Sequence, residues 1–178
     1  TTKILVDGTF FQFPRSWQVS IFDEWPQFSD TTRFGNKGCD VVALDGEDLW
    51  LIEMKDYTYP GAGAPGNLHD KIGLKAAGTM AVLFAQARTH QDSAAKDFAL
   101  SCAGVKRIHL ALHIQPKTGG RPQRYHAPLL QPHLDKLKQI SRALGLHKAH
   151  VTSTLSPHPD SPWSAQRNPA DRGRHTDR

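Results

Sequence analysis

Two acidic side chains and one lysine lie at positions where they could act together. Asp40 follows a glycine-containing loop and lies at the start of an apolar segment, residues 39–44, while Glu53 and Lys55 end a second apolar segment, residues 49–55. Strand residues that are two apart share a face, so Glu53 and Lys55 should lie side by side. Two close carboxylates repel each other unless a cation or a proton intervenes, and hard divalent ions such as Mg²⁺ prefer carboxylate oxygens. The three residues therefore predict a metal site.

The pairing of the two segments decides whether Asp40 meets Glu53. Residues 45–48, Asp-Gly-Glu-Asp, are typical of a hairpin loop. If Leu44 pairs with Leu49, antiparallel register keeps the sum of paired positions constant, and Asp40 lies opposite Glu53. Directly opposed Cβ atoms are about 5 Å apart. The alternate residues of the second strand are apolar and should face the other way: Trp50, Ile52 and Met54.

The alternative is an ordinary cluster of surface salt bridges on a solvent-facing strand. The neighbours predicted for the same face are apolar, which a wholly solvated face would not be. They are Val42, Leu44, Leu49 and Leu51. Charged residues at the edge of a buried face are uncommon without a function, so we interpret the three residues as a functional site.

The two segments resemble the PD-(D/E)XK nuclease superfamily. They read Gly38-Cys39-Asp40-Val41-Val42-Ala43-Leu44 and Leu51-Ile52-Glu53-Met54-Lys55-Asp56-Tyr57. The superfamily pattern is an Asp, a gap over a β-hairpin and then (Asp or Glu)-x-Lys, and here twelve residues separate Asp40 from Glu53-Met54-Lys55. The residue before the Asp is Cys39, where the superfamily usually has proline.

This resemblance implies a Mg²⁺-dependent nuclease, with Mn²⁺ able to substitute. Asp40, Glu53 and the backbone carbonyl of Met54 would bind the ion, and Lys55 would hold the attacking water and help to deprotonate it. We also expect Cys39 to be packed rather than reactive and to point to the face opposite Asp40.

Many members of the superfamily supply a further acidic residue from a helix ahead of the hairpin. Glu24 and Asp23 are the candidates here, but Pro26 leaves little room for a helix around them. Whether one or two metal ions bind stays open at this point.

The fold implied is α/β and restriction-endonuclease-like, with a central mixed sheet of four to five strands flanked by helices. We expect one domain over residues 1–155 and a disordered polar and basic tail over residues 156–178, where almost no apolar residues occur. Expected strands are 3–6, 17–22, 39–44, 49–55, 107–115 and 148–154. Expected helices are 67–89, with Ile72, Ala76, Met80, Leu83, Phe84 and Ala87 buried, 92–103 and 128–144.

The charge distribution suggests a polyanion partner. Residues 1–100 hold 9 basic and 13 acidic residues, whereas residues 101–178 hold 13 basic and 4 acidic residues. A basic region beside a metal-binding one suits nucleic acid, although a merely solvated surface would have the same composition. The residues predicted to contact nucleic acid are Lys75 and Thr79 in the helix after the hairpin and Lys117, Arg121 and Arg124 in a later loop.

DNA is the favoured substrate, cut by an endonuclease in antiviral defence or DNA processing, by analogy with this fold. The alternatives are a nuclease for RNA, single-stranded or structured DNA, and a non-catalytic module that binds nucleic acid or protein. A homodimer or a partner subunit could provide targeting. Two unpaired cysteines indicate a reducing, cytoplasmic location, and no apolar run approaches the roughly 18 residues of a membrane span.

Overall fold

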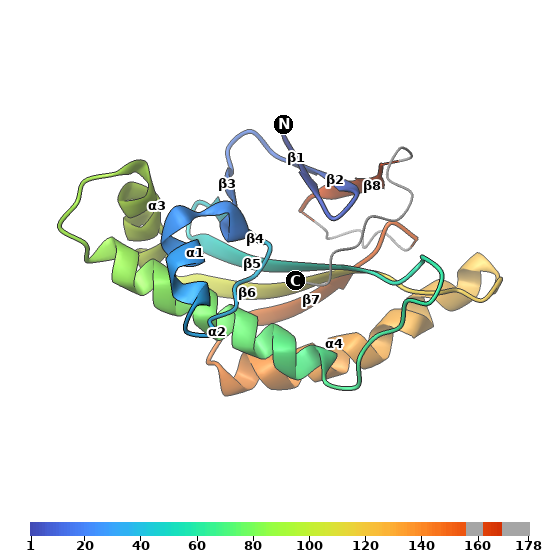
Figure 1. Ribbon diagram of the computed structural model, residues 1–178. Coiled ribbons are helices and arrows are strands. Elements are labelled where there is room, and N and C mark those ends of the chain that lie inside the picture. Colours follow the sequence, from blue (N-terminus) through green and yellow to red (C-terminus); the bar gives the residue numbers. More distant parts are fainter. Residues whose placement is uncertain (156–161, 169–178) are drawn as a thin grey trace.

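A five-stranded mixed sheet forms the centre of the computed structural model, which describes residues 1–155 and 162–168 (Figure 1). Its strands, in spatial order, are β3 (Gln18–Ile21), β4 (Val41–Asp45), β5 (Asp48–Asp56), β6 (Arg107–Gln115) and β7 (Lys148–Thr152). Neighbours from β3 to β5 are antiparallel, and those from β5 to β7 are parallel. A tight turn joins β4 to β5, whereas parallel strands need long crossovers, which helices provide here. The expected mixed α/β sheet is confirmed.

Helices cover one face of this sheet (Figure 1). They are α1 (Pro26–Thr32), α2 (Leu68–Ala87), α3 (Ala94–Ala103) and α4 (His126–Ala143), with short 3-10 turns η1 (Phe22–Glu24) and η2 (Gln123–Tyr125). Alternate residues of β4, β5 and β6 pack against α2 and α4 in a cluster that we call the helix-side core. Pro26 begins α1 instead of breaking a helix, because the first helical position needs no N–H donor.

A small antiparallel sheet covers the other face, where the sequence predicts flanking helices (Figure 1). Its order is β1 (Thr2–Val6), β2 (Thr9–Phe13) and β8 (Ser164–Arg167). The intervening residues of the central strands, among them Trp50, Ile52 and Met54, pack against it in a second cluster, the sheet-side core. Successive residues of the central strands thus pack alternately into the two cores, because both faces of the sheet are covered.

The predicted tail is wrong for residues 162–168. Trp163 is 5% exposed and packs on the rings of Phe13, Trp17 and Trp50, and the four residues after it pair with β2. One large ring and a row of backbone hydrogen bonds anchor a segment whose average composition is polar. The other parts of the predicted tail, 156–161 and 169–178, lie outside the described residues.

Details of other elements also differ from expectation. The hairpin loop is two residues long, Gly46-Glu47, with Gly46 at φ +56°, and Asp45 pairs with Asp48. In α2, Phe84 is exposed while Thr79 and Val82 are buried. Across residues 1–155 and 162–168, no helix combines the length and the apolar character needed to cross a membrane.

Candidate active site

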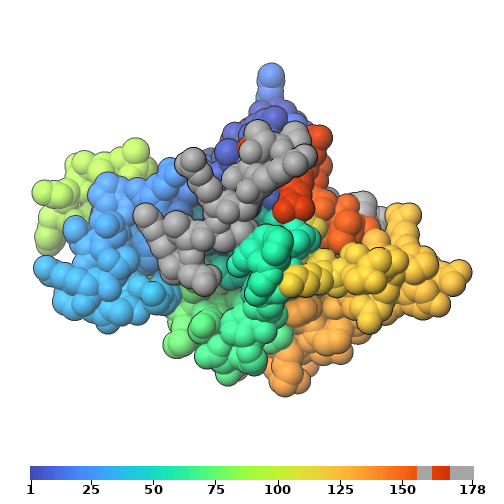
Figure 2. Space-filling model, turned by 45° about the vertical axis from the view of Figure 1, so that its right-hand side comes forward, coloured from blue at the N-terminus to red at the C-terminus, as the bar shows by residue number. Residues whose placement is uncertain are grey.

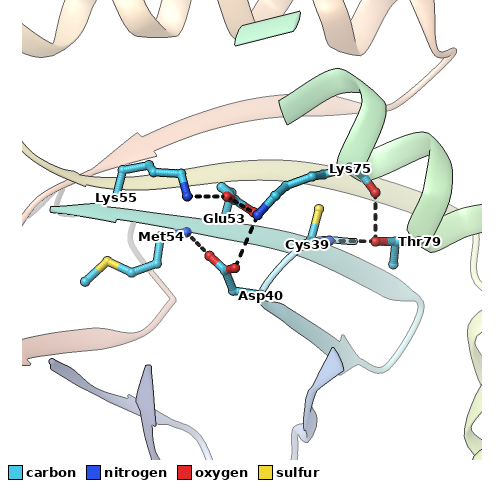
Figure 3. A network of polar contacts seen from close by, with 7 residues as sticks. All are labelled: Cys39, Asp40, Glu53, Met54, Lys55, Lys75 and Thr79. Atoms are coloured by element: carbon cyan, nitrogen blue, oxygen red, sulfur yellow. Dashed lines mark hydrogen bonds and ion pairs between the residues drawn. The ribbon is translucent and has the colours of Figure 1, made fainter. Parts of the chain in front are cut away.

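Asp40, Glu53 and Lys55 meet where β4 begins and β5 ends (Figure 3). The expected register is confirmed, since Leu44 pairs with Leu49 and Val41 with Ile52. Asp40 lies one residue outside this ladder. Its carboxylate reaches across and accepts a hydrogen bond from the Met54 N–H, at 2.7 Å. The backbone of β5 therefore positions the Asp40 side chain.

The same bond indicates where the Met54 carbonyl points. In an antiparallel pair, the N–H and C=O groups of one residue face the same neighbouring strand. The Met54 N–H faces Asp40, so its carbonyl faces that side too, beyond Val41, the first residue of β4. A carbonyl oxygen directed to the edge beside two carboxylates suits the metal-ligand role predicted for it.

Glu53 is completely buried on the helix-covered side. Its Oε1 lies 2.8 Å from the Lys55 Nζ and 2.6 Å from the Lys75 Nζ. Its Oε2 is also buried, and it has no hydrogen-bond partner among the described residues. Burial and the neighbouring Asp40 carboxylate raise the pKa of Glu53 to about 7, although both lysines oppose the shift.

Lys75 lies between the two carboxylates rather than out in solvent (Figure 3). Besides the contact with Glu53, its Nζ is 3.5 Å from Asp40 Oδ1, and the side chain is only 16% exposed. Burial alone would lower the pKa of Lys75, but Glu53 and Asp40 raise it well above its usual value. Lys75 is therefore a cation, and two carboxylates and two ammonium groups form a cluster that is neutral when all four are ionised.

Thr79 is fully buried and connects α2 to the loop that carries Asp40 (Figure 3). Its Oγ1 accepts a hydrogen bond from the Cys39 N–H at 2.8 Å and donates one to the Lys75 carbonyl oxygen at 2.9 Å. This position does not fit the predicted nucleic-acid contact. Cys39 is packed, as expected: its side chain lies in the helix-side core, and burial raises the pKa of its thiol far above the usual range.

Of the two further acidic candidates, Asp23 is the one whose pKa is raised in part by Asp40. It lies in η1, directly after β3. Partial burial, with Asp40 and Glu24 nearby, raises the pKa of Asp23. Glu24 acts on Asp23, its neighbour in the chain. A contribution of Asp23 to the site stays a prediction.

The oxygens of Asp40 and Glu53 fit a hydrated Mg²⁺ ion once the Lys75 ammonium moves away from them. Glu53 Oε2 lacks a hydrogen-bond partner within the described part of the chain, and Asp40 Oδ1 is held only loosely by the Lys75 Nζ, at 3.5 Å. Mg²⁺ commonly takes one or two carboxylates and completes its shell with water. Residues 1–155 and 162–168 contain no group of three or more His, Cys, Asp or Glu side chains that could hold a metal ion. Water would therefore have to complete the coordination shell of the ion.

The predicted basic residues lie in the segment that follows β6. Lys117, Arg121 and Arg124 are all exposed. Because β5 and β6 are parallel, this segment starts at the same edge of the sheet as the carboxylates. It lies beside the segment that follows β5 (Figure 2, teal beside yellow). An open hollow between the two is lined by Thr58, Tyr59, Pro60, Lys117, Thr118 and Gly119.

The histidines of β6 take structural positions. His109 stacks on Trp50 and lies 2.8 Å from Asp48 Oδ1, at the opposite end of the strands from Glu53. His113 contacts the Thr152 hydroxyl, and burial lowers its pKa to about 4. Both side chains are therefore held by neighbours within the fold.

Comparison with known proteins gives little further guidance. No protein-family model matches the chain, and no solved structure matches it. A cysteine--tRNA ligase of Neisseria meningitidis serogroup A / serotype 4A (strain DSM 15465 / Z2491) is 25% identical over an alignment of 147 residues, and the match covers 64% of this chain. The match spans 21% of that protein, so this chain corresponds to about a fifth of its length.

Proposed function

We propose that this chain is a Mg²⁺-dependent nuclease of the PD-(D/E)XK type, with a restriction-endonuclease-like core, and that it cuts DNA as an endonuclease. The observation that carries the proposal is the completely buried Glu53 carboxylate, which has one oxygen without a partner among the described residues and lies beside Asp40 and Lys55. Burying such a group is costly, and a metal-binding role explains why it is there.

In this proposal Asp40, Glu53 and the Met54 carbonyl hold the ion. When bound, Mg²⁺ would neutralise charge on the phosphate and lower the pKa of a bound water. Burial alone would lower the pKa of Lys55, but the Glu53 and Asp40 carboxylates together raise it above the usual value. Lys55 is thus a cation, and its Nζ can orient the attacking water or a phosphate oxygen.

The basic segment supports a nucleic acid as the substrate. Lys117, Arg121 and Arg124 are exposed beside the edge that carries the carboxylates, where they can follow a phosphate backbone. Arg124 lies over the ring of Tyr125, at 5.0 Å, and this exposed ring is available for stacking on a base. A role in defence or DNA processing follows from analogy with the fold, and the two free cysteines fit a cytoplasmic location.

A second candidate function is a non-catalytic binding module. The neutral cluster of Asp40, Glu53, Lys55 and Lys75 favours it, because such a cluster is stable without a metal ion. RNA is the alternative substrate, and the partial similarity to a cysteine--tRNA ligase is a reason to include tRNA among the substrates tested.

The test is nicking of supercoiled plasmid with Mg²⁺ or Mn²⁺ by the wild type, Glu53→Ala and Lys55→Ala. Glu47→Ala is the matched control, because Glu47 is an exposed acidic residue in the turn of the same hairpin. We expect metal-dependent cleavage that falls roughly a hundredfold or more in the two site variants and is unchanged in the control. Parallel lanes contain tRNA and single-stranded DNA. If no nucleic acid is cut, the binding module is the better assignment.

A further inference from the structure

Lys75 takes the position that a divalent ion would need (Figure 3). Its ammonium contacts Glu53 Oε1 at 2.6 Å and lies 3.5 Å from Asp40 Oδ1, so it reaches one oxygen of each predicted ligand. Lys55 also contacts Glu53 Oε1, at 2.8 Å, but it comes from the same strand as Glu53. Lys75 comes from α2, so its side chain covers the two carboxylates from the helix-covered side of the sheet.

An ammonium and a divalent ion cannot both stay at this position. Mg²⁺ binds carboxylate oxygens at about 2.1 Å, so the two cations would lie only a few ångströms apart. Repulsion at that distance is strong in a site this poorly exposed to water, where screening is weak. Binding of the metal therefore requires the ammonium to move.

We propose that Lys75 is a built-in counter-ion that competes with the divalent cation for Asp40 and Glu53, and that its ammonium leaves them when the metal binds. This inference rests on the metal site of the proposed function. Without metal, Lys75 balances the two carboxylates, and the fold does not depend on the ion. With metal, the lysine is released.

The structure allows the side chain to move while the helix stays in place. The Lys75 carbonyl accepts a hydrogen bond from the Thr79 hydroxyl, whose oxygen in turn accepts one from the Cys39 N–H, so the backbone of α2 is tied to the loop before Asp40. The lysine side chain has four flexible carbon–carbon bonds. Once released, its ammonium would remain at the same edge of the sheet, within reach of a substrate phosphate, which is the contact that the sequence predicts for Lys75.

The first test measures Mn²⁺ affinity from the electron paramagnetic resonance signal of free Mn²⁺, at pH 8.5 so that Glu53 is largely ionised. The proteins are the wild type, Lys75→Met and the control Lys71→Met, which changes an exposed lysine one turn earlier in α2. We expect Lys75→Met to bind Mn²⁺ roughly tenfold more tightly or better, and the control to be unchanged. Equal or weaker binding by Lys75→Met would overturn the proposal. If that variant does not fold, Lys75→Gln, which is neutral but polar, gives the same comparison.

A second test uses the unmodified protein. Its lysines are acetylated with a limiting amount of an amine-reactive ester, and labelling is read by mass spectrometry with and without Mn²⁺. The Lys75 amine should react several times faster with Mn²⁺, whereas Lys71 should not change. Unchanged labelling at Lys75 despite measured Mn²⁺ binding would contradict its release.

These results separate the inference from the proposed function. Tighter Mn²⁺ binding by Lys75→Met without any cleavage of nucleic acid would support the competition and remove the nuclease proposal. Cleavage by the wild type, with Mn²⁺ affinity unaffected by Lys75→Met, would retain the nuclease and overturn the competition. If neither the wild type nor Lys75→Met binds Mn²⁺, the inference is wrong.

Discussion

At the scale of single residues, Glu53 determines what the site can do. It is completely buried, and its two oxygens differ, since Oε1 contacts two lysines while Oε2 has no hydrogen-bond partner in the described part of the chain. Burial, with the Asp40 carboxylate nearby, raises its pKa from 4.5 to about 7. Glu53 can thus be protonated under mildly acidic conditions and become ionised near neutral pH.

This shift predicts how stability depends on pH without metal. Between about pH 4.5 and 7 the folded protein keeps a proton on Glu53 that the unfolded chain has lost, so the free energy of unfolding falls as the pH rises through this window. We expect the wild type to lose stability relative to Glu53→Gln between pH 4.5 and 7, as measured by urea denaturation. Other titrating groups are shared by the two proteins and largely cancel. A difference that does not vary with pH would contradict the raised pKa.

At the scale of elements, close contact between α2 and the loop before β4 positions Asp40. At Gly78 an added Cβ would lie 2.0 Å from the Lys37 carbonyl oxygen and 2.3 Å from Asn36 Oδ1. Only glycine allows this approach, and the neighbouring Thr79 then accepts a hydrogen bond from the Cys39 N–H. The helix therefore holds the loop directly, and the position of Asp40 depends on it.

Gly78→Ala should accordingly destabilise the protein, although alanine is the better helix former by about 1 kcal/mol. We expect a net loss of about 1–3 kcal/mol from the steric clash, together with slower cleavage. Gly73→Ala is the control in the same helix, because its nearest neighbour would be the Ile140 side chain, at 3.2 Å, which can shift. Urea denaturation of both variants tests this. Equal effects at the two glycines would mean that the close approach is not needed.

In the molecule as a whole, both faces of the central sheet are covered, and the strand β8 near the C-terminus takes part in covering one of them. Trp163 lies in the sheet-side core with Phe11, Phe13, Trp17 and Trp50. β8 then adds to β2. The N-terminal hairpin and a segment some 150 residues away in sequence thus complete one layer.

Trp163→Ala should lower the free energy of unfolding by about 3–5 kcal/mol, as is typical of a large buried aromatic residue. Gln166→Ala, an exposed position on β8, should change it by less than about 0.5 kcal/mol. Denaturation followed by tryptophan fluorescence would be unreliable here because a tryptophan is removed, so circular dichroism is preferred. A small effect at Trp163 would show that the segment is not part of the core in solution.

Nucleic-acid binding is also a property of the whole surface. Replacing Lys117, Arg121 and Arg124 together by alanine should weaken binding of a DNA duplex and reduce the slope of log affinity against log salt concentration. The slope should fall by up to about 0.9 for each phosphate that the variant no longer neutralises. The measurement is fluorescence anisotropy over a salt series, in Ca²⁺ or without metal so that no cleavage occurs.

The control variant removes the same amount of charge from exposed positions elsewhere. Its positions are Lys136, Lys138 and Lys148, in α4 and at the start of β7. An equal loss of affinity and of slope in both triple variants would mean that net charge, and not the segment after β6, governs binding.

The sequence alone determined the features that depend on local pattern. The period-two alternation located the central strands, and turn residues placed the hairpin whose register brings Asp40, Glu53 and Lys55 together. These residues are at most 15 positions apart, and a short hairpin leaves them little freedom. Helix α2 was also predictable, because its apolar spacing is regular, although Phe84 shows that the pattern alone does not assign each side chain to the core.

The distant segments that complete the site and the core follow from how the elements pack, which the local pattern of residues does not show. Lys75 lies between the carboxylates, Thr79 binds the loop before Asp40, and Trp163 with β8 closes the second face. These contacts join residues that are 22 or more positions apart in the sequence. The periodicity of apolar residues within one element does not indicate how that element packs against another. A lysine on a polar helix face has the same pattern whether it faces water or a buried carboxylate, and only the packing of α2 on the sheet distinguishes the two.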